Sequence, residues 1–244
     1  MKTRILLLVM IFSLKGFSQD SLAVPKLKSQ VFSLSPISKK VDEVNGLVFG
    51  VGHVENRKVT SQTINGANIE ANPAPIAGAF VAFWAILNLP EIFKNNKYQD
   101  SIDENSEEYL KIKNWDYTPH LKINGLNLST GCFFTTTSMN GLNISVANKF
   151  KDFNGVSITP LGTISDRHNG VAIGIYNANN NLAGLSIGIF NQSQNVKGLH
   201  LGILNRAKNN HGLQIGFFNK SNSKGLQIGV WNVNGKRSLP FLNW

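Results

Sequence analysis

Apolar and polar residues alternate with a period of two along the C-terminal half of the chain. In the segment GLQIGFFN, which begins at Gly212, the residues Leu213, Ile215 and Phe217 are apolar and Gln214 between them is polar. Such alternation in a run rich in Ile and Leu, bounded by Gly and Asn, is typical of a β-strand. A helix would place Leu213 and Ile215 on different faces and would include two glycines, each costing about 1 kcal/mol relative to alanine. The pattern therefore predicts a strand.

This segment is one of five closely similar units. They read GVAIGIYN, GLSIGIFN, GLHLGILN, GLQIGFFN and GLQIGVWN, and they begin at Gly170, Gly184, Gly198, Gly212 and Gly225, with spacings of 14, 14, 14 and 13 residues. The residues between them are polar and rich in Asn, which suits tight turns. Each repeat of about 14 residues is thus predicted to be one strand plus one turn. Weaker copies begin at Gly46, Gly66, Gly125, Gly141 and Gly155.

We therefore expect an all-β protein with a single β-repeat domain over residues 20–244, in which residues 125–244 hold the regular repeats. One repeat cannot bury an apolar face alone, so neighbouring strands must stabilise one another. Our first expectation is an antiparallel meander closed into a β-barrel of the outer-membrane type, with apolar residues facing outward and Gly, Ser, Gln and His facing inward. The terminal Trp244 favours it, because the last strand of such barrels usually ends in an aromatic residue.

The alternative is a parallel β-solenoid. It is favoured by a column of asparagines at one repeat position, because these side chains would form a hydrogen-bonded ladder if equivalent residues of successive coils lay side by side. The column consists of Asn177, Asn191, Asn205, Asn219 and Asn232. A repeat that is one strand long also favours the solenoid, because barrels alternate short turns with longer loops and predict a two-strand repeat.

The repeats are interrupted by an insertion over residues 72–119. Its first part, residues 74–89, is apolar and ends at Pro90, which suggests a short helix that plugs or caps the repeats, or a segment that seeks a membrane. Its second part is acidic around Asp103 and Glu108. That part lacks the ligand spacing of a calcium loop and is expected to be a solvated helix or loop.

The N-terminus predicts export. Residues 1–19 combine Lys2 and Arg4 with a short apolar run and then small residues, which is the build of a secretory signal peptide. Removing this leader would lower the formal net charge from +10 to +7. The remaining basic residues stand singly in predicted turns, without interleaved aromatics, so we expect no nucleic-acid partner. The only cysteine is Cys132, which excludes an internal disulfide.

Catalytic and metal-binding residue types do not form a recognisable motif in this sequence. The five histidines show no ligand spacing, and no base accompanies Cys132. We therefore predict no catalytic residue, no cofactor, no metal site and no small-molecule substrate, and hence no enzyme. The one candidate site is a polar interaction face formed by the third position of successive repeats, namely Ser186, His200, Gln214 and Gln227.

The units GLQIGFFN and GLQIGVWN, together with the closing NGKRSLPFLNW, resemble the bacterial surface-repeat proteins with GLQIG-type repeats. The resemblance covers Gly170 to Trp244 best and implies a surface or outer-membrane location, but it brings no activity. Our expectation is thus a non-enzymatic outer-membrane or cell-surface protein of a Gram-negative bacterium, with a structural or interaction role and with outer-membrane lipid or an envelope polymer as partner. The alternative is a soluble, periplasmic β-solenoid that binds a glycan or another envelope polymer through its polar face.

Overall fold

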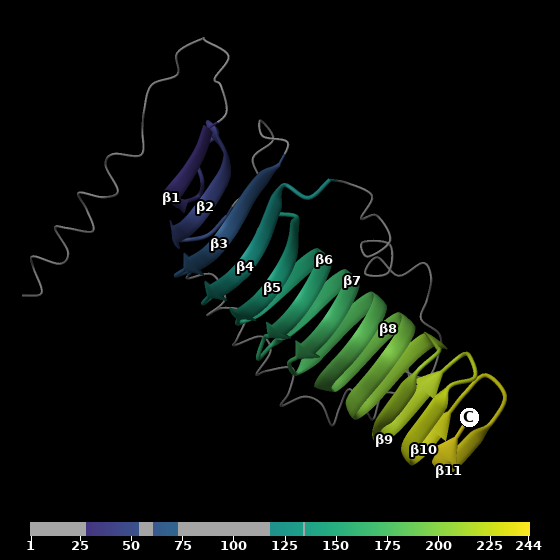
Figure 1. Ribbon diagram of the computed structural model, residues 1–244. Helices are drawn as coiled ribbons and strands as arrows, with labels where there is room; N and C mark the ends of the chain where they lie inside the picture. The colour runs from purple at the N-terminus through teal and green to yellow at the C-terminus, as the bar shows by residue number, and fades with distance from the viewer. Residues whose placement is uncertain (1–27, 54–60, 73–117, 134) are drawn as a thin grey trace, which may run out of the picture.

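The computed structural model describes residues 28–53, 61–72, 118–133 and 135–244 (Figure 1). Every regular element within these ranges is a strand, and the eleven strands form one sheet in chain order. The strands are β1 (Lys28–Ser35), β2 (Val41–Gly50), β3 (Gln62–Glu70), β4 (Leu121–Ser129), β5 (Thr137–Ser145), β6 (Ala147–Ile158), β7 (Gly162–Ile173), β8 (Tyr176–Asn210), β9 (Leu213–Ser221), β10 (Leu226–Val233) and β11 (Ser238–Asn243). The predicted leader and residues 73–117 of the insertion lie outside the described residues.

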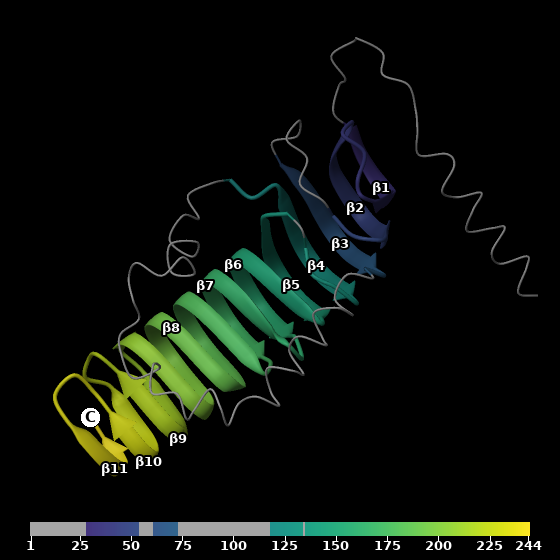
Figure 2. The same cartoon turned by 180° about the vertical axis from the view of Figure 1, so that it is seen from behind.

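The strands are parallel from β1 to β10, so the predicted antiparallel barrel is wrong and the alternative, a parallel β-solenoid, is confirmed. Only β11 runs antiparallel to its neighbour β10. The views from both sides show the coils stacked in one row, with β1 at one end and β11 at the other (Figures 1 and 2). Because consecutive strands are parallel, the chain completes one coil between them and starts each new strand in the same direction.

Strand β8 extends over 35 residues because it winds through more than two coils without a break. The pairing brings equivalent repeat positions side by side. In β9 and β10, for example, Ile215 pairs with Ile228 and Asn219 pairs with Asn232. In the regular repeats like residues therefore stack on like, as the solenoid alternative requires. The pairing is less uniform between β6 and β7, where Phe153 pairs with His168.

The glycine that opens each repeat lies where neighbouring coils approach most closely. Gly125 has φ +134°, in the region that L side chains rarely adopt, and a Cβ atom there would lie 2.1 Å from the carbonyl oxygen of Gly66. Only glycine fits such a position, because it has no Cβ to clash. This explains why every unit begins with the same residue.

The interior of the solenoid changes character along its length. Its first coils enclose a continuous apolar cluster, formed by Ile37, Val41, Val44, Val48, Ile64, Leu121, Ile123, Phe133, Met139, Phe150 and Phe153. The later coils hold only the small cluster of Leu182, Val196 and Ala207. Most other buried side chains in those coils are polar, so the regular repeats depend on interior hydrogen bonds more than on an apolar core.

Candidate functional site: an apolar face over an asparagine-filled coil

The predicted polar face lies inside the solenoid. Ser186, His200, Gln214 and Gln227 are each 0% exposed. The Ser186 hydroxyl donates to Asn191 Oδ1 at 2.7 Å, and Gln227 Nε2 donates to Gln214 Oε1 at 2.8 Å. His200 Nε2 lies 3.0 Å from the Ser193 hydroxyl, and burial lowers the pKa of His200 to about 4. These four residues therefore support the coil and offer no surface to a polymer.

The asparagine column proposed for the solenoid is present, and it also points inward. Asn191 Nδ2 donates to Asn205 Oδ1 at 2.9 Å, and Asn205 Nδ2 donates to Asn219 Oδ1 at 2.8 Å. The same amide groups also donate to the backbone of the next coil, since Asn205 Nδ2 lies 2.9 Å from the Ile215 carbonyl oxygen. Each asparagine thus ties its coil to the next through two acceptors. Buried polar groups paired this fully add stability and specify the register.

The second glycine of each unit makes room for this column. A Cβ atom at Gly216 would lie 2.4 Å from Asn205 Nδ2 and 2.3 Å from the carbonyl oxygen of Gly202. A side chain at that position would displace the asparagine amide from its acceptors. The glycine and the asparagine three residues later therefore recur together, because the glycine of one coil leaves the space that the asparagine amide of the preceding coil fills.

Because the polar positions are inside, the apolar positions of each unit are outside. We define the apolar face as the large apolar side chains that project outward, 37 to 53% exposed, from the strand segments between the opening glycine and the asparagine of each repeat. They are Leu142, Ile144, Val156, Ile158, Ile173, Leu201, Ile203, Phe217, Phe218, Leu226, Ile228, Val230 and Trp231. The outward direction is the one predicted for the barrel, although the strands that carry it are parallel.

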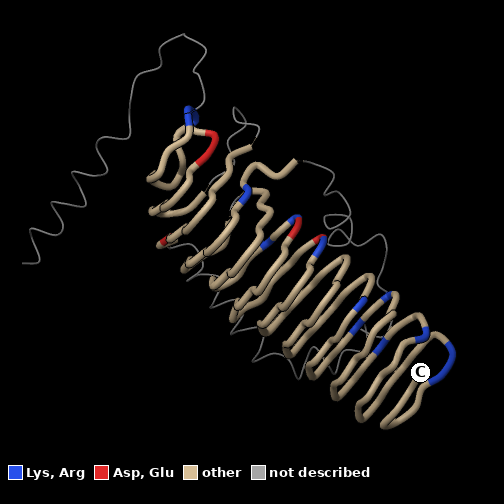
Figure 3. Tube along the Cα trace, in the orientation of Figure 1, with Lys and Arg blue, Asp and Glu red and all other residues tan. Residues whose placement is uncertain are grey.

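The apolar face is a regular surface without charges. Its members line up along the row, since Ile144 pairs with Ile158 and Ile158 pairs with Ile173. None of the five regular Gly-to-Asn segments contains Asp, Glu, Lys or Arg. The basic residues of these repeats follow the asparagine in the returning part of the coil, and Figure 3 shows the Lys and Arg positions gathered along one edge of the stack.

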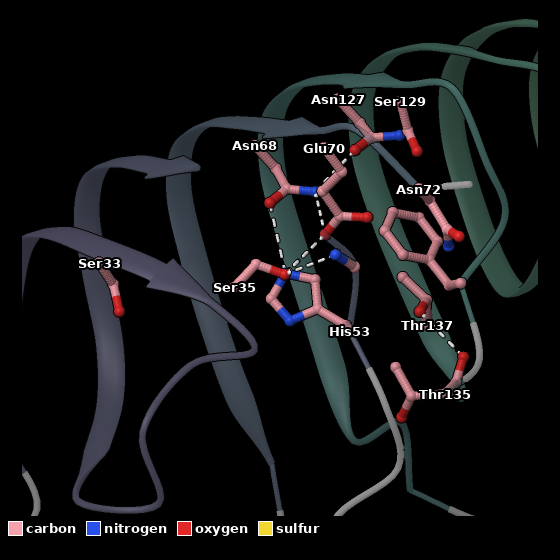
Figure 4. A network of polar contacts seen from close by, with 12 residues as sticks. Ser33, Ser35, His53, Asn68, Glu70, Asn72, Asn127, Ser129, Thr135 and Thr137 are labelled. Atoms are coloured by element: carbon pink, nitrogen blue, oxygen red, sulfur yellow. Dashed lines mark hydrogen bonds and ion pairs between the residues drawn. The ribbon is translucent and has the colours of Figure 1, made fainter. Parts of the chain in front are cut away.

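A polar network occupies the interior near the N-terminal end (Figure 4). His53 Nε2 lies 2.9 Å from Glu70 Oε1 and 3.3 Å from Asn68 Oδ1, and Asn68 Nδ2 donates to Asn127 Oδ1 at 2.8 Å. The Ser35 hydroxyl donates to Glu70 Oε1 at 3.4 Å. The network thus links β1, β3 and β4 with the residues that follow β2. Sequence reasoning missed the pair of His53 and Glu70, because only the register of the coils brings these residues together.

This network combines a serine, a histidine and a carboxylate, but its geometry does not suit nucleophilic catalysis. The serine bonds to the carboxylate, whereas an activated serine needs a bond to its base. His53 is 3% exposed and Glu70 is 2% exposed, so a substrate has no access to either. The network is best understood as a continuation of the interior hydrogen bonds.

The other candidate groups do not converge either. His168 stacks on Phe153 with a centroid distance of 4.8 Å, and burial lowers the pKa of His168 to about 4. The neighbouring Arg167 forms an ion pair with Asp152. Burial raises the pKa of the Cys132 thiol, which makes this thiol a weaker nucleophile. Among the described residues, no three His, Cys, Asp or Glu side chains gather in a group that could hold a metal ion.

The in-register stack of parallel coils defines the class of the protein, a parallel β-solenoid whose first coils have an apolar core and whose regular repeats have a mainly polar interior and an apolar outer face. Comparison with known protein families, characterised proteins and solved structures found no match to the chain. In the part of the chain that the structure describes, no helix is long and apolar enough to cross a membrane.

Proposed function

We propose that this chain is an exported, non-enzymatic structural protein of the bacterial envelope that acts by assembling with another macromolecule through its apolar face. The predicted signal peptide supports export, and the resemblance to surface-repeat proteins supports an envelope location. The polar groups of the coil are engaged in holding neighbouring coils together, which supports a structural role rather than a catalytic one.

The observation that carries the proposal is the size of the apolar face. If each of its thirteen side chains has about 200 Å² to expose, the fractions of 37 to 53% correspond to about 1,000 Å² of apolar surface. The largest apolar patch on a typical soluble monomer is about 300–600 Å². A continuous surface well above that range is characteristic of an interaction site.

The alternative role is binding of an envelope glycan through Ser186, His200, Gln214 and Gln227. These residues cannot contact a glycan, because all four are buried. A partner that approaches the Gly-to-Asn segments contacts aliphatic and aromatic side chains instead. The recognition chemistry of this surface is therefore apolar packing, and the partner must offer an apolar surface of comparable extent.

The proposal is tested with the full chain expressed in a Gram-negative host. N-terminal sequencing of the cell fractions reports export, and native electrophoresis of the envelope extract reports the size of the assembly. A face variant with Ile203→Thr, Phe217→Thr and Val230→Thr keeps β-branched residues in the strands. Its matched control replaces three exposed positions of the returning segments, with Lys197→Thr, Asn222→Thr and Lys224→Thr.

We expect the wild type and the control to migrate as an assembly larger than one chain, and the face variant to migrate as a single chain. Retention of the uncleaved chain in the cytoplasm would contradict the export clause. Identical migration of all three proteins would contradict the role of the apolar face.

A further inference from the structure

We infer that the macromolecule that covers the apolar face is a second copy of this chain, packed face to face about a twofold axis. This inference rests on the proposed function, because it names the partner of the same surface. Three features of the molecule carry it: the regularity of the face, its area and the placement of the charges.

The regularity of the face makes it self-complementary. Equivalent residues such as Ile215 and Ile228 pair in register, so the side chains form rows that cross the strands with a repeat of about 4.8 Å. A second copy offers rows with the same repeat, so ridges on one copy can fit between ridges on the other along the whole length. A twofold axis makes this contact isologous and closes the assembly at two chains.

The area agrees with a stable dimer. Two faces of about 1,000 Å² would bury about 2,000 Å² in total, which lies at the upper end of standard interfaces and at the beginning of the range of obligate homodimers. Aromatic side chains enrich the core of such interfaces. Here Phe217, Phe218 and Trp231 supply them, and their exposed fractions are 53%, 45% and 45%.

The placement of charge selects a second copy over an anionic lipid surface. Without its leader the chain carries a formal net charge of +7, so two copies associate most readily through a surface that holds no charge. The Gly-to-Asn segments meet that condition. The basic side chains extend from the returning segments, along the edge seen in Figure 3, so they do not frame the apolar face as an anionic membrane surface would require.

The C-terminal end also directs association to the side of the stack. The antiparallel strand β11 folds back on β10, and the Arg237 guanidinium lies 4.0 Å from the centroid of the Trp244 ring. Arg237 Nη2 further donates to the Trp244 carbonyl oxygen at 2.8 Å. This closing strand ends the parallel register of β1 to β10.

The experiment measures the molar mass of the purified chain after removal of its leader, residues 20–244, by light scattering coupled to size-exclusion chromatography. We expect the wild type to elute at twice the chain mass. A variant with Ile203→Lys and Phe217→Lys should elute at one chain mass, a twofold fall. The control variant with Lys197→Thr, Asn222→Thr and Lys224→Thr should remain dimeric. Circular dichroism verifies that each protein is folded.

A second readout does not depend on any variant. Two differently tagged wild-type copies are expressed together, and we expect one tag to retain the other during purification. Failure to retain it, together with a wild type that elutes at one chain mass, would overturn the inference even if the lysine variant does not fold.

The remaining outcomes separate the inference from the proposed function. A purified monomer that still enters a large assembly in the envelope extract would overturn self-association and leave the proposed function standing. If that monomer floats with vesicles of phosphatidylethanolamine and phosphatidylglycerol, lipid covers the face. A purified monomer that neither floats with vesicles nor enters an assembly in the envelope extract would overturn both proposals.

Discussion

Replacing Asn205 with alanine tests whether the inner asparagine column holds the coils together. Asn205 is 2% exposed and lies in the middle of the column. Its Nδ2 group donates to Asn219 Oδ1 at 2.8 Å and to the Ile215 carbonyl oxygen at 2.9 Å, and its Oδ1 atom accepts from Asn191 Nδ2 at 2.9 Å. The substitution removes all three hydrogen bonds.

The size of the effect follows from what the neighbours lose. Asn219 Oδ1 loses its donor in the column inside the coil, and a buried polar group left unsatisfied costs about 1–3 kcal/mol. Asn191 Nδ2 retains one acceptor, the Leu201 carbonyl oxygen at 3.1 Å, so its loss is partial. Together with the lost bond to Ile215, we expect Asn205→Ala to destabilise the surrounding coils by about 3 kcal/mol.

The matched control is Asn209→Ala in the same coil. Asn209 belongs to an outer column, where its Nδ2 group donates to Asn195 Oδ1 at 2.8 Å, but it is only partly buried and water can replace the bond. Its loss should therefore cost about 0.5–1 kcal/mol. The pair of variants compares the same chemical change inside and outside the coil.

Amide hydrogen exchange is the appropriate assay, because long repeat arrays can unfold locally and lose a single global transition. Opening free energies of amides in β8 and β9 should fall by about 3 kcal/mol in Asn205→Ala, and those in β2 and β3 should not change. Equal and small effects of the two variants would refute the structural role of the inner column.

Three further variants test other parts of the structure. In His200→Gln, glutamine continues the inner row of the following coils and removes a histidine whose folded pKa is about 4. In the unfolded chain this histidine binds a proton near pH 6.5, whereas in the folded chain it stays neutral down to about pH 4. The wild type therefore loses stability as the pH falls from 6.5 to 4, and the variant should lose about 3 kcal/mol less of its unfolding free energy over the same range in urea titrations. Equal acid sensitivity would contradict this. Gly216→Ala places a methyl group 2.4 Å from Asn205 Nδ2 and should destabilise by at least about 2 kcal/mol, so an unchanged melting temperature would count against the close fit. Arg237→Ala removes the stacking on Trp244 and should speed exchange in β10 but not in β7.

The local structure was predictable from the sequence because glycine and asparagine have specific roles here. The period of 14 residues and the alternation within GLQIGFFN predicted one strand and one turn per repeat, which β9 and β10 confirm, whereas β8 runs through two of the units without a turn. The asparagine column was also predictable for a solenoid, since equal spacing places equal residues side by side. Direction was not predictable in the same way. The one-strand repeat and the asparagine column favoured the solenoid, while the terminal Trp244 favoured the barrel, and only the parallel pairing, as of Asn219 with Asn232, decides between them.

The position of the candidate site was the main error, and its cause is physical. Alternation shows that a strand has two faces, but it does not say which face is enclosed. The barrel expectation placed the apolar residues outward, as the structure has them, whereas the polar interaction face required the polar residues to lie outside. In the regular coils the enclosed space holds polar side chains: the Ser186 hydroxyl donates to Asn191, and His200 Nε2 lies within hydrogen-bond distance of the Ser193 hydroxyl. The larger Phe217 and Trp231 side chains lie outside.

The register also explains why the insertion leaves the solenoid intact. Gly66 and Gly125 are separated by 59 positions in sequence, yet they pair directly across β3 and β4. At the other end, the spacing shortens to 13 between Gly212 and Gly225, and Gln214 still pairs with Gln227. Both changes in length fall in the connections between the strands. The column positions Asn191, Asn205 and Asn219 keep a constant spacing of 14 residues, because each amide must meet an acceptor in the next coil. A connection between strands meets no such condition, so it can carry an inserted segment such as residues 73–117.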